Sequence, residues 1–449
     1  MTERGHEPWR ELRDRLASQQ PLSCRGANGF RLEWLLPAMA PEGWIRWMRQ
    51  RNDGSRWFWQ AREGHWQLGL GQARRVDLSA PDARLPAEIR GLLIWPFSSS
   101  PENGDWGELA HPRLLEPRFH LCGDSRGLEL SWTCDAPDTA SALARLQALL
   151  AEPVSDRPSR VLKAHLLADS SREQWNQGVA RILEGFDSGA LEKCVLSCWR
   201  DYQWDAAPDV FELLERLPAD QGTRLVVAAG DAGSFLALSP EKLYRRGGHE
   251  LWCDALAGTR QAGHATASPD LESELMDSDK DRREQALVSA ALVRELREAG
   301  ATRIDCGPVH TSQAGSLLHL RSTVHAGRTP DSGDLALVRT LHPTPALCGT
   351  PREAARTLLA SLESHSRGLY GGLVGPLSPD WTELSVGIRS ARLQGRTLRL
   401  YAGAGLVPGS DVDAEWQETR HKLAVLESAL GLQPESSPRS RSTLHAHRH

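Results

Sequence analysis

Between about residue 170 and residue 430 the chain alternates short apolar segments with longer amphipathic ones. Residues 191–199, 224–229, 235–238 and 251–257 are short and rich in Val, Leu, Ala and Cys, as buried strands are. Residues 271–298, 351–364 and 412–430 instead carry apolar residues at helical spacing. This alternation predicts an α/β (α+β) protein in which helices cover the strands.

Residues 383–391 and 397–402 predict a hairpin that turns at residues 394–395, where Gln is followed by Gly. Alternate aliphatic residues of each strand share one face of the sheet. Arg389 and Tyr401 fall on the opposite face of their strands. We therefore expect both side chains to point away from the aliphatic layer, into a polar site.

The first 150 residues contain ten of the sixteen tryptophans. Residues 44–48 and 56–60 are dense in them and predict short strands separated by Gly, Asn and Pro turns. This part of the chain contains no cluster of residue types that suggests catalysis. Its expected role is structural.

A polar, Pro-containing segment at residues 151–159 predicts a boundary. We expect residues 1–155 to form a Trp-rich lobe that completes the sheets, and residues 160–430 to form the catalytic region. The tail 434–449 is rich in Ser, Arg and His, a composition typical of disorder.

The composition narrows the possible partners and locations. The 53 basic and 58 acidic side chains give a net charge of −5, which argues against nucleic acid or an anionic membrane as the main partner. No segment reaches the ~18 consecutive apolar residues of a membrane span, and the polar start predicts a cytoplasmic protein. The eight cysteines include no CxxC pair and predict reduced, mostly buried thiols.

Acidic residues at helical spacing form the first candidate site. On the last predicted helix Glu415, Glu418 and Lys422 share one face, and Asp281 and Glu284 have the same spacing on an earlier helix. Two helices with paired carboxylates can hold a hard cation such as Mg²⁺. From the pattern alone, solvated helix faces are the more common explanation.

Three further signals are individually weak. Gly403 and Gly405 alternate after a strand, where backbone N–H groups can approach an anion, although tight-turn glycines look the same. Glu241 follows a strand end, where an acid can face a cleft or merely water. Lys193 begins an apolar strand, and a desolvated lysine has a lowered pKa and can act as a base. A lysine at a sheet edge that points to water is the common alternative.

Taken together and in order, these motifs resemble the chorismate-binding enzymes, namely the isochorismate, salicylate, anthranilate and aminodeoxychorismate synthases. The motifs are 239–241 (SPE), 254–259 (DALAGT), 279–284 (DKDRRE), 342–347 (HPTPAL), 367–372 (RGLYGG), 388–391 (IRSA), 401–405 (YAGAG) and 415–423 (EWQETRHKL). The resemblance implies two antiparallel β-sheets packed face to face with surrounding helices, and an active site between the sheets.

The resemblance also implies a Mg²⁺ site. Glu284 and Glu418 match the residues that ligate the ion. Glu415 matches a further ligand, and Asp281 lies in or near the same shell. The sequence therefore predicts Mg²⁺ as the cofactor.

Substrate-binding residues follow from the same resemblance. Arg389, Tyr370, Lys422 and the backbone of Gly403 and Gly405 would hold the carboxylates of chorismate.

Further motif residues add to this site. Tyr401, Thr259 and His342 lie within three of the motifs and are additional substrate-binding candidates. Lys193 matches the residue that activates water, and Glu241 matches the general acid that protonates the departing C4 hydroxyl.

Two positions separate the branches of the family. The anthranilate branch has glutamine at the position of Lys193, and the aminodeoxychorismate branch has a nucleophilic lysine at the position of Ala257. The nucleophile expected here is therefore water. The family's usual residues are replaced by Gln285, Cys198 and Cys348, which blurs the subtype without touching a proposed catalytic group.

The sequence thus predicts an isochorismate synthase, an isomerase that is a monomer or homodimer. The alternatives are a salicylate synthase, an isochorismate synthase of a siderophore pathway, an anthranilate synthase subunit, and a chorismate-binding protein without turnover. The segment 383–390 and the divergent N-terminal third resemble the menaquinone branch most.

Overall fold

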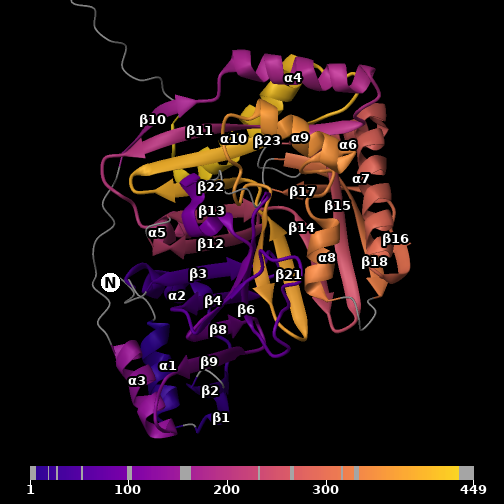
Figure 1. The fold of residues 1–449 in the computed structure, drawn as a ribbon. Coiled ribbons are helices and arrows are strands. Elements are labelled where there is room, and N and C mark those ends of the chain that lie inside the picture. Colours follow the sequence, from indigo (N-terminus) through magenta and orange to yellow (C-terminus); the bar gives the residue numbers. More distant parts are fainter. Residues whose placement is uncertain are drawn as a thin grey trace, which may run out of the picture.

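The strands form two antiparallel sheets in the computed structural model. It describes residues 7–18, 20–26, 29–51, 54–98, 104–151, 163–230, 233–262, 267–314, 317–327 and 333–433. Within these residues sheet A has 13 strands and sheet B has 10 (Figure 1). The prediction of two antiparallel sheets is confirmed.

Sheet A contains, in spatial order, β1 (Leu22–Gly26), β2 (Gly29–Leu36), β9 (Leu128–Cys134), β8 (Phe119–Gly123), β4 (Trp66–Leu70), β3 (Ser55–Gln60), β12 (Thr223–Ala229), β13 (Ser234–Ser239), β22 (Ser390–Gln394), β23 (Thr397–Leu406), β11 (Lys193–Trp204) and β10 (Ala164–Asp169), with β19 (Gly349–Thr350) beside β11. Sheet B contains β16 (Thr302–Cys306), β18 (Leu317–Gly327), β15 (Glu250–Gln261), β14 (Lys242–Gly247), β21 (Trp381–Val386), β20 (Leu373–Leu377), β6 (Gly91–Trp95), β7 (Arg113–Glu116) and β5 (Arg74–Asp77), with β17 (His310–Ala314) beside β18.

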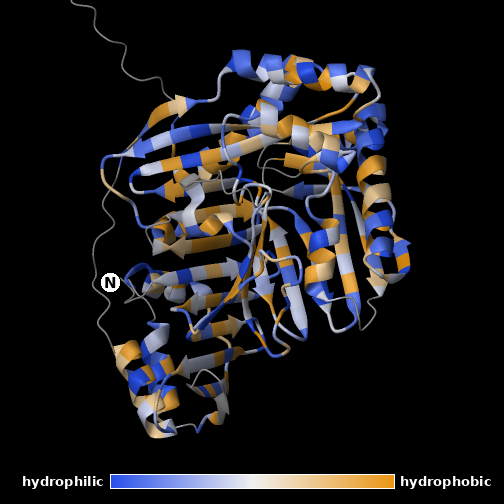
Figure 2. Ribbon diagram, in the orientation of Figure 1, coloured by the Kyte–Doolittle hydropathy of each residue, from blue (hydrophilic) through white to orange (hydrophobic). Residues whose placement is uncertain are grey.

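Helices lie around the sheets. The described residues form α1 (Pro8–Leu16), α2 (Pro41–Arg49), α3 (Thr139–Ala151), α4 (Arg172–Asp187), α5 (Val210–Glu215), α6 (Pro269–Asp277), α7 (Asp279–Glu298), α8 (Asp334–Leu341), α9 (Arg352–Leu362), α10 (Val412–Leu430) and the 3₁₀ helix η1 (Gly104–Ala110). Two of them matter for the site: α7 packs along β15 and β18, and α10 packs on β23. In Figure 2, α7 contains both hydrophilic and hydrophobic residues, and its buried residues include Val288, Leu292 and Leu296, as expected for a helix that covers a sheet.

The core has two layers because successive strand residues point to opposite faces. On β12, Leu225 and Val227 join a cluster that also takes in Leu92 of sheet B. Val226 and Ala228 join the other cluster, which also contains apolar residues of α2, α5 and α10. One face of sheet A therefore packs on sheet B and the other packs under helices.

Both sheets combine N-terminal and C-terminal strands. In sheet A, β3 pairs with β12, and in sheet B, β6 pairs with β20. The tryptophans serve this junction: Trp57 and Trp59 of β3 are fully buried in the layer between the sheets.

One predicted strand is wrong. Residues 44–48 lie inside helix α2. Pro41 occupies its first turn, where a missing N–H costs nothing. Trp44, Ile45, Trp47 and Met48 are spaced so that a helix brings them to one side, and all four are buried. The neighbouring prediction at 56–60 is confirmed by β3.

The predicted hairpin is correct only in its second half. Strands β22 and β23 pair across residues 394–397, but residues 381–386 form β21 in the other sheet. The chain changes sheets at residues 387–389. Gly387 lies against Leu369 O, which a Cβ would approach to 2.1 Å, and Arg389 has a φ of +45°. A residue in the left-handed region cannot continue an extended strand.

The helix predicted at 271–298 is two helices, α6 and α7, which meet at Ser278. The extended backbone of Ser278 ends α6, and its hydroxyl accepts a hydrogen bond from Asp281 N at the start of α7. The helix predicted at 412–430 is confirmed by α10, and that at 351–364 by α9.

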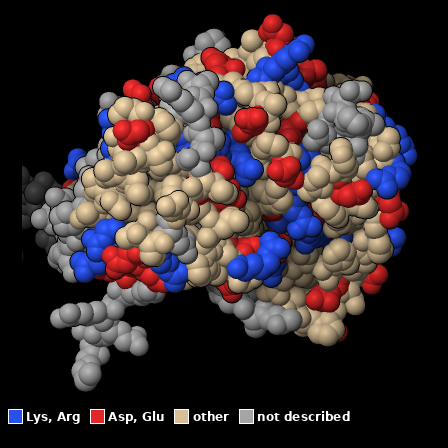
Figure 3. Space-filling view, turned by 90° about the horizontal axis from the view of Figure 1, so that it is seen from below, with Lys and Arg blue, Asp and Glu red and all other residues tan. Residues whose placement is uncertain are grey.

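Some predictions lie outside the described residues, namely most of the boundary at 151–159 and the tail 434–449. The seven described cysteines are free thiols, and five of them are buried. Within the part of the chain that the structure describes, every helix is too short or too polar to cross a membrane. On the face shown in Figure 3, basic and acidic side chains are interspersed.

Candidate active site

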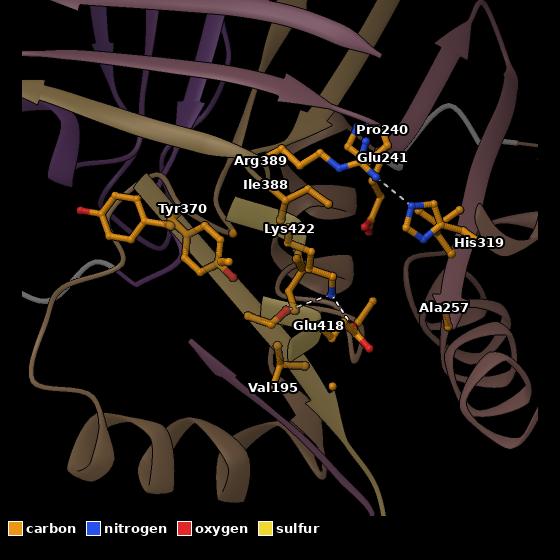
Figure 4. Close-up of a pocket in the computed structure, with 18 of the residues that line it drawn as sticks. Val195, Pro240, Glu241, Ala257, His319, Tyr370, Ile388, Arg389, Glu418 and Lys422 are labelled. Atoms are coloured by element: carbon orange, nitrogen blue, oxygen red, sulfur yellow. Dashed lines mark hydrogen bonds and ion pairs between the residues drawn. The ribbon is translucent and has the colours of Figure 1, made fainter. Parts of the chain in front are cut away.

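A pocket lies where the two sheets meet the helices α7 and α10 (Figure 4). It is lined by Val195, Pro240, Glu241, Leu256, Ala257, Gly258, Glu284, His319, Ala346, Leu347, Arg367, Tyr370, Gly371, Ile388, Arg389, Tyr401, Ala402, Gly403, Gly405, Glu418 and Lys422. Most of the residues singled out from the sequence are among them, although they are spread over nearly 200 positions of the chain.

Lys193 lies at the edge of this pocket, at the start of β11. Its side chain is 1% exposed, and its Nζ donates to Glu284 Oε1 at 2.6 Å. The sequence predicted an apolar setting for this lysine, and the structure adds a carboxylate partner. Burial raises the pKa of Glu284, but the ammonium groups of Lys193, Lys422 and Lys280 together outweigh burial and hold that pKa below its usual value.

Glu241 enters the pocket from the turn that follows β13. Ser239 Oγ accepts from Glu241 N at 3.2 Å and donates to Glu241 O at 3.0 Å, which fixes this turn. Burial, with the nearby Asp254 carboxylate, raises the pKa of Glu241 to about 8. Glu241 is therefore a carboxylic acid at neutral pH and can donate a proton.

Arg389 brings a buried guanidinium to the pocket. The left-handed backbone at Arg389 lies between β21 of sheet B and β22 of sheet A. Its Nη2 donates to His319 Nε2 at 2.8 Å (Figure 4). Burial lowers the pKa of Arg389 to about 10, so it stays cationic at neutral pH.

His319 is a neutral partner for this arginine. Burial, with the charges of Arg389 and Lys422, lowers the pKa of His319 well below its usual value. A neutral ring accepts at Nε2 and donates from Nδ1 to Gly258 O, 3.3 Å away.

Two stacked tyrosines form one wall. The rings of Tyr370 and Tyr401 are 5.3 Å apart and nearly parallel. A Cβ on Gly403 would lie 2.6 Å from the Tyr370 hydroxyl, so the glycine makes room for it. Tyr401 points into the site, as the strand alternation predicted.

Gly405 makes room for the buried ion pair. A Cβ there would lie 2.7 Å from Glu284 Oε1 and 3.2 Å from Lys193 Cε. This close packing accounts for the second glycine of the motif.

Lys422 of α10 lines the pocket and connects its own helix with β23. Its Nζ donates to Gly403 O at 2.9 Å and pairs with Glu418 Oε1 at 2.7 Å. Figure 4 shows its side chain beside Glu418, below Ile388 and Arg389.

Acidic residues of α7 and α10 lie near the ammonium group of one lysine, Lys280 of α7. Lys280 Nζ lies 2.5 Å from Glu415 Oε1, and its charge is stabilised by Glu415, Glu418 and Glu284. Glu415 Oε2 is buried without a hydrogen-bond partner. Among the described residues, no three carboxylate, imidazole or thiol groups are close enough to hold a metal ion, and each of these three glutamates is paired with a lysine. Carboxylate oxygens are the ligands that Mg²⁺ prefers, and Glu415 Oε2 is available for one, so the residue types fit the ion although they are not gathered around one point in this structure.

Comparison with known proteins places this geometry in context. The family model described as chorismate binding enzyme matches residues 87–431. The chain belongs to the chorismate-binding enzymes. The expectation drawn from the eight sequence motifs is confirmed.

The relatives of this chorismate-binding enzyme include isochorismate synthases. Isochorismate synthase MenF of Escherichia coli K12 is 30% identical over 409 residues, which cover 87% of this chain and 91% of that protein. Isochorismate synthase EntC of the same organism is 36% identical over 262 residues, covering 58% and 67% of the two chains. The solved structure of E. coli MenF, titled as the menaquinone-specific isochorismate synthase, has a TM-score of 0.77 at 24% identity and covers 94% of this chain and 98% of its own.

Five predicted site residues of this chorismate-binding enzyme do not line the pocket, namely Lys193, Glu415, His342, Asp281 and Thr259. His342 is buried with its Nε2 2.7 Å from Gly371 O, where it supports a loop of the pocket wall. Asp281 accepts from Arg260 Nη2 at 2.7 Å. The side chain of Thr259 lies outside the described residues.

Two polar pocket residues had no role assigned from sequence. His319 is the one polar residue in a Leu-rich stretch of β18, a weak signal because buried structural histidines look the same. Arg367 was noted only within its motif. Its guanidinium is held by Glu363 at 2.8 Å and by the carbonyl oxygens of Val195 and Leu347.

Proposed function

We propose that this enzyme is a Mg²⁺-dependent isochorismate synthase, an isomerase that adds water at C2 of chorismate and expels the C4 hydroxyl. The observation that carries the proposal is that a buried acid and a buried lysine lie at the same site. Glu241 lines the pocket, Lys193 is bound to the pocket residue Glu284, and the charge of Lys193 influences Glu241. A base for water and an acid for the leaving group are the two groups that this reaction needs.

Chorismate carries two carboxylates, so its pocket must supply positive charge. Arg389 and Lys422 line the pocket and Arg367 lies in its wall. We assign Arg389 and Lys422 to the substrate carboxylates, because all three nitrogens of the Arg367 guanidinium are already held by Glu363 and the carbonyl oxygens of Leu347 and Val195. The rings of Tyr370 and Tyr401 form the side against which a flat six-membered ring can pack.

The chemistry divides between two groups. Lys193, once neutral, accepts a proton from water as the oxygen bonds to C2. The double bonds of the ring shift and the C4–O bond breaks. Glu241 donates its proton to the departing oxygen, and its pKa of about 8 keeps that proton available at neutral pH.

Glu284, Glu418 and Glu415 would hold the metal ion. When bound, Mg²⁺ would neutralise these carboxylates and polarise a substrate carboxylate. These glutamates lie on α7 and α10.

Two observations support water as the nucleophile and menaquinone biosynthesis as the pathway. Lys193 and Ala257 stand where the nitrogen-using branches of the family carry other residues. A relative named MenF matches over 87% of this chain, whereas EntC matches over 58%. This favours a menaquinone pathway over a siderophore pathway.

The product formed from chorismate tests the proposal. With Mg²⁺ at neutral pH we expect isochorismate, resolved by chromatography, and the same product when ammonium is added. Anthranilate as the main product with ammonium would place the enzyme in the amination branch. Salicylate as the main product would make it a salicylate synthase.

A further inference from the structure

A second, smaller cavity lies behind Glu241. It has a volume of about 10 Å³ and polar lining from Glu241, Asp254, Glu295 and Thr344. The rest of its wall is apolar, from Leu243, Val288, Leu292 and Pro345. A space of this size holds about one water molecule if polar partners are present.

Two of the lining residues carry polar atoms without partners. Glu295 Oε2 and Thr344 Oγ1 are buried and make no hydrogen bond within the described residues. Their residues are 5% and 8% exposed, so bulk water does not satisfy them. Buried polar atoms are almost always hydrogen-bonded, to protein or to ordered water. A water molecule in this cavity would satisfy both atoms.

We propose that one water molecule binds between Glu241, Thr344 and Glu295, and that it passes a proton from Glu295 to Glu241 after each turnover. The inference rests on the proposed function, because it assumes that Glu241 is the general acid. It assigns a positioning role to Thr344 and a proton-relay role to Glu295.

The reaction creates the need for such a route. In each turnover Lys193 gains a proton from water as the C2–O bond forms, and Glu241 loses one as the C4–O bond breaks. The next turnover requires Lys193 to release its proton and Glu241 to regain one. Through the bound water, the Glu295 carboxyl gives a proton to the Glu241 carboxylate and is then reprotonated from solvent, while Lys193 releases its proton to solvent, so that the cycle closes without net change.

The charges around Glu241 suit this role. Asp254 on β15 favours its protonated form, while Lys193 on β11 and Lys422 on α10 oppose it. Burial outweighs both lysines. The acid is therefore readily reprotonated near neutral pH.

The pKa of Glu295 is also set by opposing effects. Burial raises its pKa to about 7, with Glu298 adding to the effect, although Arg352 on α9 and Arg294 on α7 lower it. Glu295 and Glu241 thus hold protons with similar affinity, which is the condition for transfer in either direction. Arg352 Nη2 donates to Glu295 Oε1, so the other oxygen remains for the cavity.

Glu295→Gln tests the relay, because an amide still accepts from Arg352 but cannot carry the proton. We expect kcat to fall about tenfold, less than the ~10²–10⁴-fold loss for an acid that touches substrate. KM for chorismate should not change, and the solvent deuterium isotope effect on kcat should rise. Glu427→Gln is the matched control, since Glu427 is also 5% exposed and bound by an arginine, Arg200, outside the pocket.

Thr344 gives a second pair of variants. Thr344→Val removes the hydroxyl and should reproduce the isotope effect, whereas Thr344→Ser should behave as wild type. The relay is overturned if Glu295→Gln turns over at the wild-type rate. It is also overturned if the rate falls with an unchanged isotope effect, as a structural defect would cause. Neither result touches the proposed function, which fails only if the wild-type enzyme makes no isochorismate.

Discussion

Replacing Lys193 with glutamine is expected to reduce isochorismate formation by ~10²–10⁴-fold, the range typical of a general base. The amide cannot take a proton from water. Because the change also leaves Glu284 without its ammonium partner at 2.6 Å, Lys193→Arg is the matched variant. Arginine keeps the positive charge but does not release its proton, so it should be similarly inactive.

These variants are measured by turnover, by thermal unfolding and by calorimetric binding of chorismate. An exposed lysine, Lys163, provides a surface control when changed to glutamine. A Lys193→Arg enzyme close to the wild-type rate would remove Lys193 as the base.

The acid side of the reaction has its own pH signature. Glu241→Gln should lose ~10²–10⁴-fold because an amide cannot protonate the leaving oxygen. Since Glu241 must be protonated and its pKa is about 8, wild-type kcat/KM should fall as pH rises through about 8. The double variant with Lys193→Gln should lose less than the product of the single losses, because the two groups act on one reaction.

Removal of Mg²⁺ is expected to reduce the rate of isochorismate formation at least as much as replacing Lys193 or Glu241 does. Excess chelator should abolish turnover, and added Mg²⁺ should restore it. Glu418→Ala should weaken Mg²⁺ binding in calorimetry, a measurement that does not depend on activity. The same change frees Lys422 from its ion pair, so chorismate binding should be followed in parallel.

Asp413→Ala is the control for the metal site, because Asp413 lies on the same helix with its side chain 84% exposed. It should bind Mg²⁺ as wild type does. Full activity in excess chelator would contradict the assignment of the glutamates on α7 and α10.

Local periodicity predicted the elements whose neighbours are close in sequence. Helix α10 begins and ends where the amphipathic pattern does, because its caps are local: Asp411 accepts from Ala414 N, and Gly431 adopts the left-handed conformation at the end. The spacing of Glu415, Glu418 and Lys422 therefore carried over to the structure.

Features that depend on the whole fold could not be predicted from the sequence. A Trp-rich segment fits a strand or a helix equally well, and only the packing around Trp44 and Trp47 decides in favour of α2. The backbone at Arg389 is left-handed because the chain passes from one sheet to the other at this point. No local sequence pattern predicts that passage. Contacts between residues far apart in the sequence, such as that of Arg389 with His319, could not be predicted either.

The sequence predicted individual residues of the site but not the ion pairs between them. The family resemblance identified Lys193 and Glu284 separately, but their ion pair spans 91 positions and the link between Glu415 and Lys280 spans 135. Long-range pairs of this kind are fixed by how α7 and α10 dock on the sheets. Spacing along one helix cannot reveal them.

The origin of the new hydroxyl tests the central claim most directly. Wild-type enzyme is incubated with chorismate and Mg²⁺ in ¹⁸O-labelled water, and the isochorismate is analysed by mass spectrometry. If Lys193 activates solvent water for attack at C2, the C2 hydroxyl should carry the label. Isochorismate that contains only unlabelled oxygen would mean that the C4 hydroxyl is transferred within the molecule, and would contradict the roles assigned to both Lys193 and Glu241.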